Sequence, residues 1–317
     1  MRRFREALSA LIGKGESFEA RARSMPRPEN HRASWADRSS LLQDSLESVL
    51  FKRFPPELNQ YIDRWHKDVL RRELQGMERG ADLAVLDVGC GYGRLAEAIR
   101  ECPPGARVVG IDISPTYAAL FARRGAGSPV LASAAALPFS DSSFDVIICV
   151  TVLMYAPPPD LQRTFREFLR CLKPNGRLLL IENSVGGYNL YTCFRVLPAV
   201  ASALGLRRSS ASAGEGHIFS RREIPSLCSS SRAAIVRREG ITAFTALLPV
   251  FQILSTLRLG FAYRFLLKFL HGSPFLPDWS LHTFCRIEKE ASGADGGAAG
   301  NAARGPELAE GISKPVR

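Results

Sequence analysis

The feature that most constrains the fold is an alternation of short apolar runs with helical stretches between residues 81 and 183. Five runs rich in Val, Ile and Leu are predicted to be strands: Ala84–Val88, Arg107–Ile113, Val130–Ala132, Phe144–Val150 and Arg177–Glu182. Segments with helical spacing of apolar residues separate these runs. This order is typical of a parallel sheet whose crossover connections are helices. The middle third of the chain is therefore predicted to be an α/β domain.

Helical segments are predicted on both sides of this domain. Residues 1–40 are rich in Arg and Ser and are expected to be a loosely ordered lead-in. Apolar residues then recur at helical spacing from Leu41 to about Arg79, where Pro55-Pro56 separates two predicted helices that act as a lid. The N-terminal extension is thus assigned to residues 1–80.

The C-terminal part adds two more predicted strands and an insertion. A helix is predicted near Ser220–Ser230, with strands near Ala234–Ile241 and His282–Glu288. An apolar helical insertion over about 244–270 separates the two strands. The main domain is assigned to residues 81–290, and the tail of residues 291–317, rich in Ala and Gly, is expected to be disordered.

The charge is distributed unevenly along the chain. The net charge is +11, but residues 81–183 hold ten basic and ten acidic side chains, whereas residues 184–290 hold thirteen and six. This distribution argues against a domain that binds nucleic acid along its whole length, and it permits an anionic partner at the flanks. The seven cysteines are scattered and form no C-x-x-C pair, so neither a disulfide framework nor a metal site is expected. A cytoplasmic location follows from this pattern.

The predicted first strand runs into a turn that contains three glycines. Asp87 precedes Gly89, Gly91 and Gly93, and a helix is predicted to begin near Leu95. Such a turn lets the backbone approach a ligand closely, and the helix offers free N–H groups. Asp112 ends the second strand, where a carboxylate is placed to accept both hydroxyls of a ribose.

This turn departs from the dinucleotide fingerprint G-x-G-x-x-G, because Arg94 stands where the third glycine would be. Asp87 instead suits the cationic head of an amino acid attached to a nucleoside. An ordinary strand–helix turn with incidental glycines is the structural alternative.

The sequence at this point resembles the class I S-adenosylmethionine-dependent methyltransferases of the small-molecule type, which include ubiquinone- and menaquinone-pathway enzymes. The resemblance covers about Val85–Glu182 and rests on three further segments: Leu137-Pro138-Phe139, Phe144–Ile148 and Leu172–Arg177. It implies a Rossmann-like sheet of seven strands, with the last strand antiparallel between the fifth and sixth, and S-adenosylmethionine as cofactor. Family members usually have an acid that contacts the adenine amino group at the position of Ser133. A serine can still accept or donate one hydrogen bond there, so Ser133 is a candidate cofactor-binding residue.

Methyl transfer requires mainly that acceptor, methyl group and sulfur be aligned, and sometimes that a proton be removed. The loops after the strands are therefore expected to hold the acceptor. His217 is the candidate general base, and Tyr155 is the candidate acceptor contact. The alternative for His217 is a purely structural role, and the alternative for Tyr155 is a side chain of the pocket wall that does not touch the acceptor. Thr151, Met154, Glu182 and Asn183 follow the fourth and fifth strands, and His66 is a candidate lid contact or a packed helix residue.

The insertion provides the main indication of the acceptor. It combines the longest apolar stretch with Arg258, Arg264 and Lys268, which suits an amphiphilic substrate or an anionic membrane surface. A helix that only packs on the sheet is the alternative. The predicted function is methyl transfer to a small-molecule or lipid-linked acceptor at O, N or C, by a cytoplasmic protein that can bind peripherally to a membrane. The alternatives are an RNA methyltransferase, a nucleotide-dependent oxidoreductase and an inactive cofactor-binding scaffold.

Overall fold

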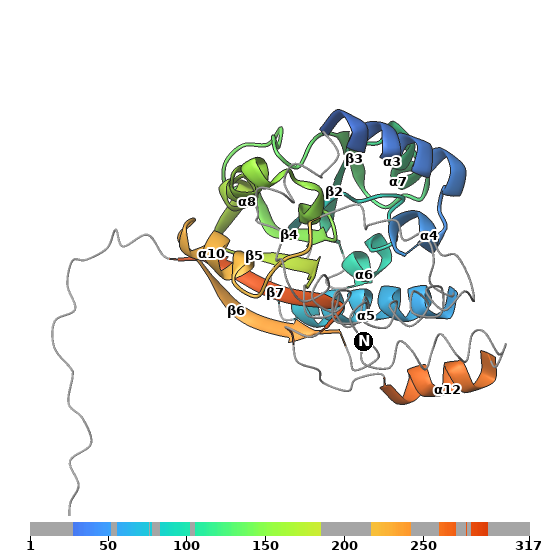
Figure 1. Ribbon diagram of the computed structural model, residues 1–317. Coiled ribbons are helices and arrows are strands. Elements are labelled where there is room, and N and C mark those ends of the chain that lie inside the picture. Colours follow the sequence, from blue (N-terminus) through green and yellow to red (C-terminus); the bar gives the residue numbers. More distant parts are fainter. Residues whose placement is uncertain are drawn as a thin grey trace, which may run out of the picture.

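The computed structural model describes most of the predicted α/β domain and parts of its flanks (Figure 1). The described residues are 28–51, 56–75, 77, 83–101, 105–184, 217–241, 260–270, 277 and 280–290. Arg258, most of the predicted insertion, the first part of the lead-in and the tail of residues 291–317 lie outside them.

The described strands form one seven-stranded sheet in the order β3-β2-β1-β4-β5-β7-β6. The first five pair in parallel, and β7 pairs antiparallel with both β5 and β6. The strands are β1 (Ala84–Val88), β2 (Arg107–Asp112), β3 (Ser128–Leu131), β4 (Phe144–Val150), β5 (Leu172–Asn183), β6 (Ala233–Gly240) and β7 (His282–Lys289). The predicted α/β fold class and the antiparallel last strand are confirmed.

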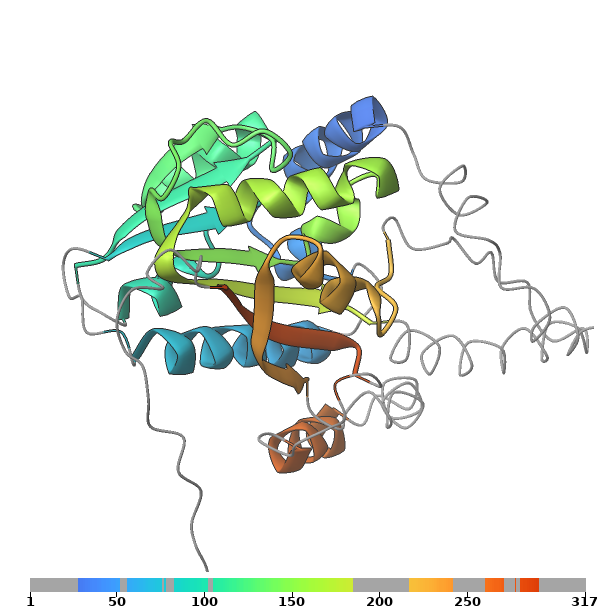
Figure 2. The ribbon, with the colours of Figure 1, turned by 90° about the vertical axis from the view of Figure 1, so that its left-hand side faces the viewer.

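Helices cover both faces of this sheet. They are α3 (Pro28–Leu42), α4 (Leu46–Val49), α5 (Pro56–Gln75), α6 (Ala96–Glu101), α7 (Pro115–Arg123), α8 (Pro158–Cys171), α10 (Glu223–Ser229) and α12 (Gly260–Leu270), with a short 3₁₀ helix η2 (Leu153–Tyr155). Figure 2 shows α5 on one side of the strands and α8 on the other. None of the described helices has the length and apolar character needed to cross a bilayer.

The strands form here because their side chains are apolar on both faces. Every residue of β1 and β4 is buried. Alternate residues of a strand point to opposite faces, so Val146 and Ile148 pack with α5 whereas Ile147 packs with α8. Two apolar layers therefore fix the sheet rigidly, and the carboxyl ends of β1, β2 and β4 come to one edge.

Two segments differ from their predicted form. Helix α3 covers residues that were expected to be loosely ordered, because its stability comes from tertiary contacts that a polar sequence does not reveal. Ser39 Oγ lies 2.9 Å from Ser114 Oγ in a buried hydrogen bond, and the Arg38 guanidinium donates to the Leu50 carbonyl at 2.7 Å. Strand β5 begins earlier than predicted, since Leu172 pairs with Phe144 before the register shifts around a bulge and Arg177 pairs with Val146.

Candidate active site

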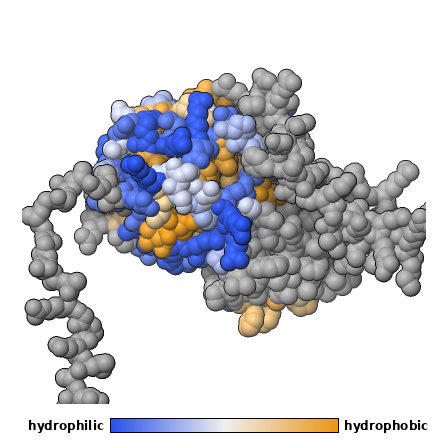
Figure 3. Space-filling model, turned by 60° about the vertical axis from the view of Figure 1, so that its left-hand side comes forward, coloured by the Kyte–Doolittle hydropathy of each residue, from blue (hydrophilic) through white to orange (hydrophobic). Residues whose placement is uncertain are grey.

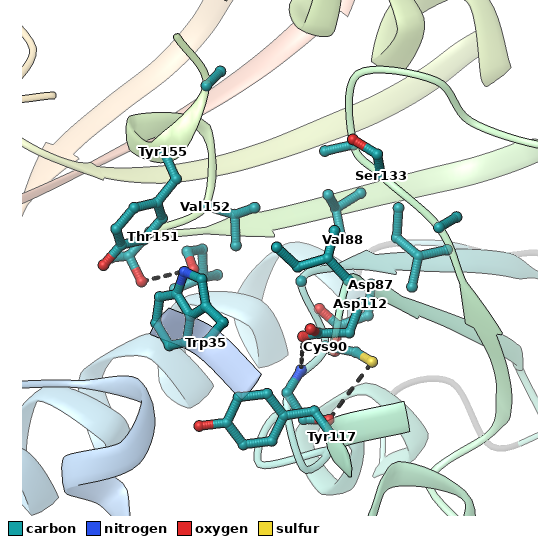
Figure 4. Close-up of a pocket in the computed structure, with 18 of the residues that line it drawn as sticks. Trp35, Asp87, Val88, Cys90, Asp112, Tyr117, Ser133, Thr151, Val152 and Tyr155 are labelled. Carbon is teal, nitrogen blue, oxygen red and sulfur yellow. Dashed lines mark hydrogen bonds between the residues drawn. The ribbon is translucent and has the colours of Figure 1, made fainter. Parts of the chain in front are cut away.

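A cavity of about 710 Å³ opens at the carboxyl ends of β1, β2 and β4. This volume lies in the range of small-molecule sites. Figure 4 shows Asp87 and Asp112 close together in its wall, with Trp35 and Tyr155 on one side and Ser133 on the other. The carboxyl edge of a parallel sheet is where ligands bind in open α/β folds.

The glycine turn contributes Gly89 and Gly91 to the lining of this cavity, whereas Gly93 lies against Ala126 and Phe121 outside the lining. Gly89, Gly91 and Gly93 all have positive φ, at 67°, 53° and 84°. A Cβ atom on Gly89 would lie 2.3 Å from Cγ2 of Val152, so the turn and the segment after β4 can approach only without a side chain there. The Gly91 N–H donates to Asp112 Oδ2 at 3.0 Å, which ties the turn to the end of β2. The predicted glycines are therefore brought together with both predicted carboxylates.

Asp87 is the most unusual carboxylate of the cavity. It is 1% exposed, and its Oδ2 has no hydrogen-bond partner. Burial raises the pKa of Asp87 to about 7; the positive charge of Arg94 opposes this shift, and the negative charge of Asp112 adds to it. A buried carboxylate without a partner is costly unless a cation or donor reaches it. The position thus fits the ammonium group of an amino acid.

Asp112 is held in place by the backbone. Its Oδ1 accepts the Ser114 N–H at 2.8 Å, and its Oδ2 accepts the Gly91 N–H. Burial raises the pKa of Asp112 to about 6, although these backbone N–H groups favour the charged form. Each carboxylate oxygen can accept a second hydrogen bond, so both remain able to receive a ribose hydroxyl.

Arg94 links the cavity to a buried polar chain beneath it. Its guanidinium donates to Asp63 Oδ1 at 2.9 Å and to His66 Nδ1 at 3.0 Å. His66 Nε2 then lies 2.9 Å from His282 Nδ1. A guanidinium can only donate, so His66 is neutral, and burial together with the charge of Arg94 holds its pKa well below the usual range. His66 is consequently a packed residue of α5 and is not among the residues that line the cavity.

The N-terminal helices cover one side of the cavity. Trp35 of α3 and Val49 of α4 line it, and the Trp35 ring meets the Tyr155 ring edge-on at 5.1 Å between centroids. Tyr117 of α7 donates to the Ser48 carbonyl at 3.0 Å. The sequence analysis did not predict that Trp35 lines the cavity. The signal available for it was a single tryptophan within an otherwise polar segment.

The predicted acceptor residues after β4 and β5 occupy different environments. Tyr155 and Thr151 line the cavity, whereas Met154 and Asn183 are buried beside it. Glu182 accepts the Leu153 and Val152 N–H groups at 2.7 and 3.1 Å. Burial raises its pKa to about 8, although these N–H groups favour the charged form. Glu182 therefore holds the backbone of the cavity wall.

His217 is not among the residues that line the cavity. Its Nε2 is 2.6 Å from Glu223 Oε1, and its backbone N–H donates to the Met154 carbonyl at 2.7 Å. Burial acts to raise the pKa of Glu223, but the hydrogen bonds from His217 and Ser220 outweigh it and lower that pKa to about 2. The imidazole is thus oriented by a carboxylate and sits next to the cavity wall.

Ser133 lines the cavity but is exposed. Its Oγ accepts the Ala135 N–H at 3.3 Å within a local turn. The neighbouring lining residues Ala132, Ala134 and Ala135 have no polar side chains. Sequence reasoning did not anticipate that Asp160 and Thr164 of α8 line the same cavity.

Comparison with known proteins agrees with this geometry. Residues 86–180 match the model of a methyltransferase domain family. The demethylmenaquinone methyltransferase of Thermus thermophilus is 36% identical over 123 residues, which are 35% of this chain and 54% of that protein. The chain contains a class I S-adenosylmethionine-dependent methyltransferase domain. A ubiquinone/menaquinone biosynthesis C-methyltransferase of Geobacter sulfurreducens is 32% identical over 151 residues, covering 43% of this chain and 57% of the relative.

The methyltransferase domain thus matches only part of these relatives, since the chain spans little more than half of their length. Two solved structures resemble its fold. The cyclase SpnF has a TM-score of 0.54 at 18% identity, covering 84% of this chain and 97% of its own. A geranyl diphosphate C-methyltransferase from Streptomyces coelicolor has a TM-score of 0.52 at 18% identity, with coverages of 84% and 100%.

Proposed function

We propose that this protein transfers a methyl group from S-adenosylmethionine to a small apolar or lipid-linked acceptor. The observation that carries the proposal is the unpartnered, buried carboxylate of Asp87 beside the glycine turn. A cation or hydrogen-bond donor would satisfy it, and Asp112 lies next to it with oxygens able to accept ribose hydroxyls. A nucleoside that bears an amino acid meets both demands, whereas a dinucleotide would place a pyrophosphate against Asp87.

In this proposal the donor supplies, when bound, a methyl group already activated by a sulfonium. Asp87 holds the ammonium group, Asp112 holds the ribose, and Gly89 and Gly91 let the backbone of the turn lie against the ligand. Trp35 and Tyr155 close one side of the cavity, which excludes water and favours an apolar acceptor. The protein thus acts mainly by alignment.

We retain Tyr155 as the acceptor contact and His217 as the base. Tyr155 lines the cavity, which supports its part in the proposal. If the Nε2–H of His217 donates to Glu223, then Nδ1 is the nitrogen that takes a proton from the acceptor. The His217 N–H donates to the carbonyl of Met154, the residue before Tyr155 of the cavity lining, which supports a place for His217 near the acceptor.

The acceptor class is supported by the names of the relatives. They include methyltransferases of demethylmenaquinone and ubiquinone/menaquinone biosynthesis, together with a sterol 4-C-methyltransferase of Caenorhabditis elegans. Quinones and sterols are apolar. The fold alone does not decide the chemistry, since SpnF shares it and is a cyclase.

We also propose that α12 binds an anionic membrane surface from which such an acceptor is taken. Its Phe261, Phe265 and Phe269 are 71, 74 and 75% exposed, while Leu267 on the opposite side is buried in the core. Arg264 and Lys268 are exposed as well. At about 100° per residue, the three phenylalanines and the two cations fall within an arc of roughly 140°. The described part of the helix contains no acidic residue.

This arc has the composition of an interfacial helix. Apolar side chains project at the lower edge of the molecule in Figure 3, the edge at which α12 lies in Figures 1 and 2. Near an anionic surface each cation contributes about 1 kcal/mol. Salt screens that contribution but not the burial of the phenylalanines.

Vesicle sedimentation tests this part of the proposal. Charge reversal of Arg264 and Lys268 together should reduce binding to anionic vesicles by at least tenfold, and neutral vesicles should bind little protein. The matched control reverses Arg163 and Arg166, which are exposed on α8 at the other face of the sheet. Equal losses for both pairs, or no vesicle binding by the unmodified protein, would contradict a membrane role for α12.

Methyl transfer itself is tested with a donor that carries a labelled methyl group. The protein is incubated with that donor and with a cell lipid extract or total RNA. The label should enter the lipid fraction and not the RNA, and Asp87→Asn should reduce transfer at least tenfold when the donor is limiting. Label in the RNA would favour an RNA methyltransferase, and donor binding without transfer to any fraction would favour an inactive scaffold.

A further inference from the structure

Two polar side chains of α8 line the cavity without any part in the donor contacts described above. Asp160 and Thr164 lie four residues apart and therefore on the same side of the helix. Thr164 is 1% exposed, and its Oγ1 has no hydrogen-bond partner. An unpartnered buried hydroxyl is unfavourable, so a polar group of a ligand is the natural partner for Thr164.

Their place in the cavity identifies the part of the ligand that they meet. The ribose carboxylate Asp112 ends β2, and β3 is the next strand toward the edge of the sheet. The segment after β3 lines the cavity with Ala132, Ala134 and Ala135, and Pro157 lines it next to α8. These apolar side chains suit the faces of a flat ring. If the proposed donor binds with its ribose at Asp112, its base lies between this segment and α8.

The segment after β3 has few polar side-chain atoms that could form hydrogen bonds with the edge of that base. Its alanines have no polar side-chain atoms, and Ser133 is exposed with its Oγ already accepting the Ala135 N–H. A further side-chain acceptor for the base edge would come from another element. Helix α8 provides two, the Thr164 hydroxyl and the Asp160 carboxylate.

We infer that α8 recognises the base of the donor, with Asp160 and Thr164 accepting the two hydrogens of the adenine 6-amino group. This inference rests on the proposed function, because it requires an adenosyl ligand. A base with an oxygen at position 6 would direct lone pairs at the Asp160 carboxylate. Such a contact excludes the wrong base by repulsion as well as by a lost hydrogen bond. Asp160 and Thr164 would therefore determine which nucleoside the protein accepts.

The test compares two ligands by calorimetry: S-adenosylhomocysteine and its inosine analogue, which has an oxygen in place of the 6-amino group. The unmodified protein should bind the adenosyl ligand at least tenfold more tightly. Asp160→Asn adds an amide N–H that can donate to the oxygen, so the preference should shrink to threefold or less. Thr164→Val should weaken the adenosyl ligand about fivefold, and Thr164→Ser should restore its affinity.

Ser133→Ala tests the competing assignment, in which the base is read at the position expected from the family, and it should leave both affinities unchanged. A loss of the preference in Ser133→Ala but not in Asp160→Asn would overturn the inference and assign base recognition to the segment after β3. An unmodified protein that binds both ligands equally would overturn it too. An unmodified protein that binds neither ligand would instead refute the proposed donor, which is a separate result. Asp160→Asn lies in the first turn of α8 at a half-buried position, so it keeps the test valid if Thr164→Val fails to fold.

Discussion

The role of Asp87 as the ammonium site can be tested through the pH dependence of ligand binding. Burial raises its pKa from 3.8 to about 7, so ionising the carboxyl in the empty cavity costs about 4 kcal/mol more than in water. The interaction with a bound ammonium group offsets that free energy and stabilises the charged form of the carboxylate. Binding must therefore release the proton whenever Asp87 is protonated beforehand.

The sign of the effect follows from this linkage. Below pH 7 an increasing share of the protein carries the neutral carboxyl, so the affinity for S-adenosylhomocysteine should fall. Between pH 7.5 and pH 5 the loss should be roughly 50- to 100-fold for a pKa of about 7. At alkaline pH the α-amino group of the ligand loses its own charge, and the affinity should fall again. The maximum is expected above pH 7, between the titration of Asp87 and that of the ligand amine.

Asp87→Asn removes the charge and keeps the shape. At pH 7.5 the loss of a charge-assisted hydrogen bond should weaken S-adenosylhomocysteine by about 1.5–3 kcal/mol, which is about 10- to 150-fold. The decline toward pH 5 should also become much shallower. Calorimetric titrations at several pH values measure both effects.

5′-Methylthioadenosine serves as the control, because it lacks the amino-acid head but keeps the ribose. Its affinity should not respond to Asp87→Asn, and it reports any contribution from Asp112, whose pKa of about 6 lies in the same range. A folded Asp87→Asn variant that binds S-adenosylhomocysteine within threefold of the unmodified protein, with the same pH profile, would refute the reasoning.

Three further substitutions test other parts of the site. Asp112→Ala should weaken donor binding by about 2–4 kcal/mol, because two ribose hydroxyls lose their acceptor; unchanged calorimetric affinity in a folded variant would remove Asp112 from the site. Gly91→Val places a β-branched side chain at a φ of 53° and should abolish donor binding while the circular dichroism spectrum stays the same. A variant that binds the donor normally would show that the turn is not the cofactor site. His217→Ala should lower kcat at constant donor affinity and remove one limb of the pH–rate profile, whereas an intact profile would leave His217 as the structural partner of Glu223.

Much of the sheet could be predicted because its strands are continuous apolar runs bounded by turns. Ala84–Val88 and Phe144–Val150 have the predicted bounds, since strands buried on both faces leave a clear signal. The strand order could not be derived in this way, because pairing joins residues far apart. The number of strands and the antiparallel placement of β7 came from the family resemblance.

The cofactor side of the site was predictable for a local reason. Asp87, the three glycines and Asp112 sit at strand ends, where the sequence alone shows both the turn and the carboxylates. Side chains brought in by helices were not predictable. Trp35 lies in a helix whose sequence has no amphipathic pattern, so nothing in that pattern places it at the cavity. The sequence around Thr164 indicates only that it is a buried residue of α8. The contact of His66 with His282 joins positions 216 residues apart.

The donor assignment is tested most directly by titrating the unmodified protein with S-adenosylmethionine and, in parallel, with NAD⁺ at pH 7.5. A buried unpartnered Asp87 beside Asp112 predicts one saturable site for S-adenosylmethionine per chain and no measurable heat with NAD⁺. Saturable binding of NAD⁺, or the absence of any S-adenosylmethionine binding by folded protein, would contradict the assignment of this cavity as a methyl-donor site.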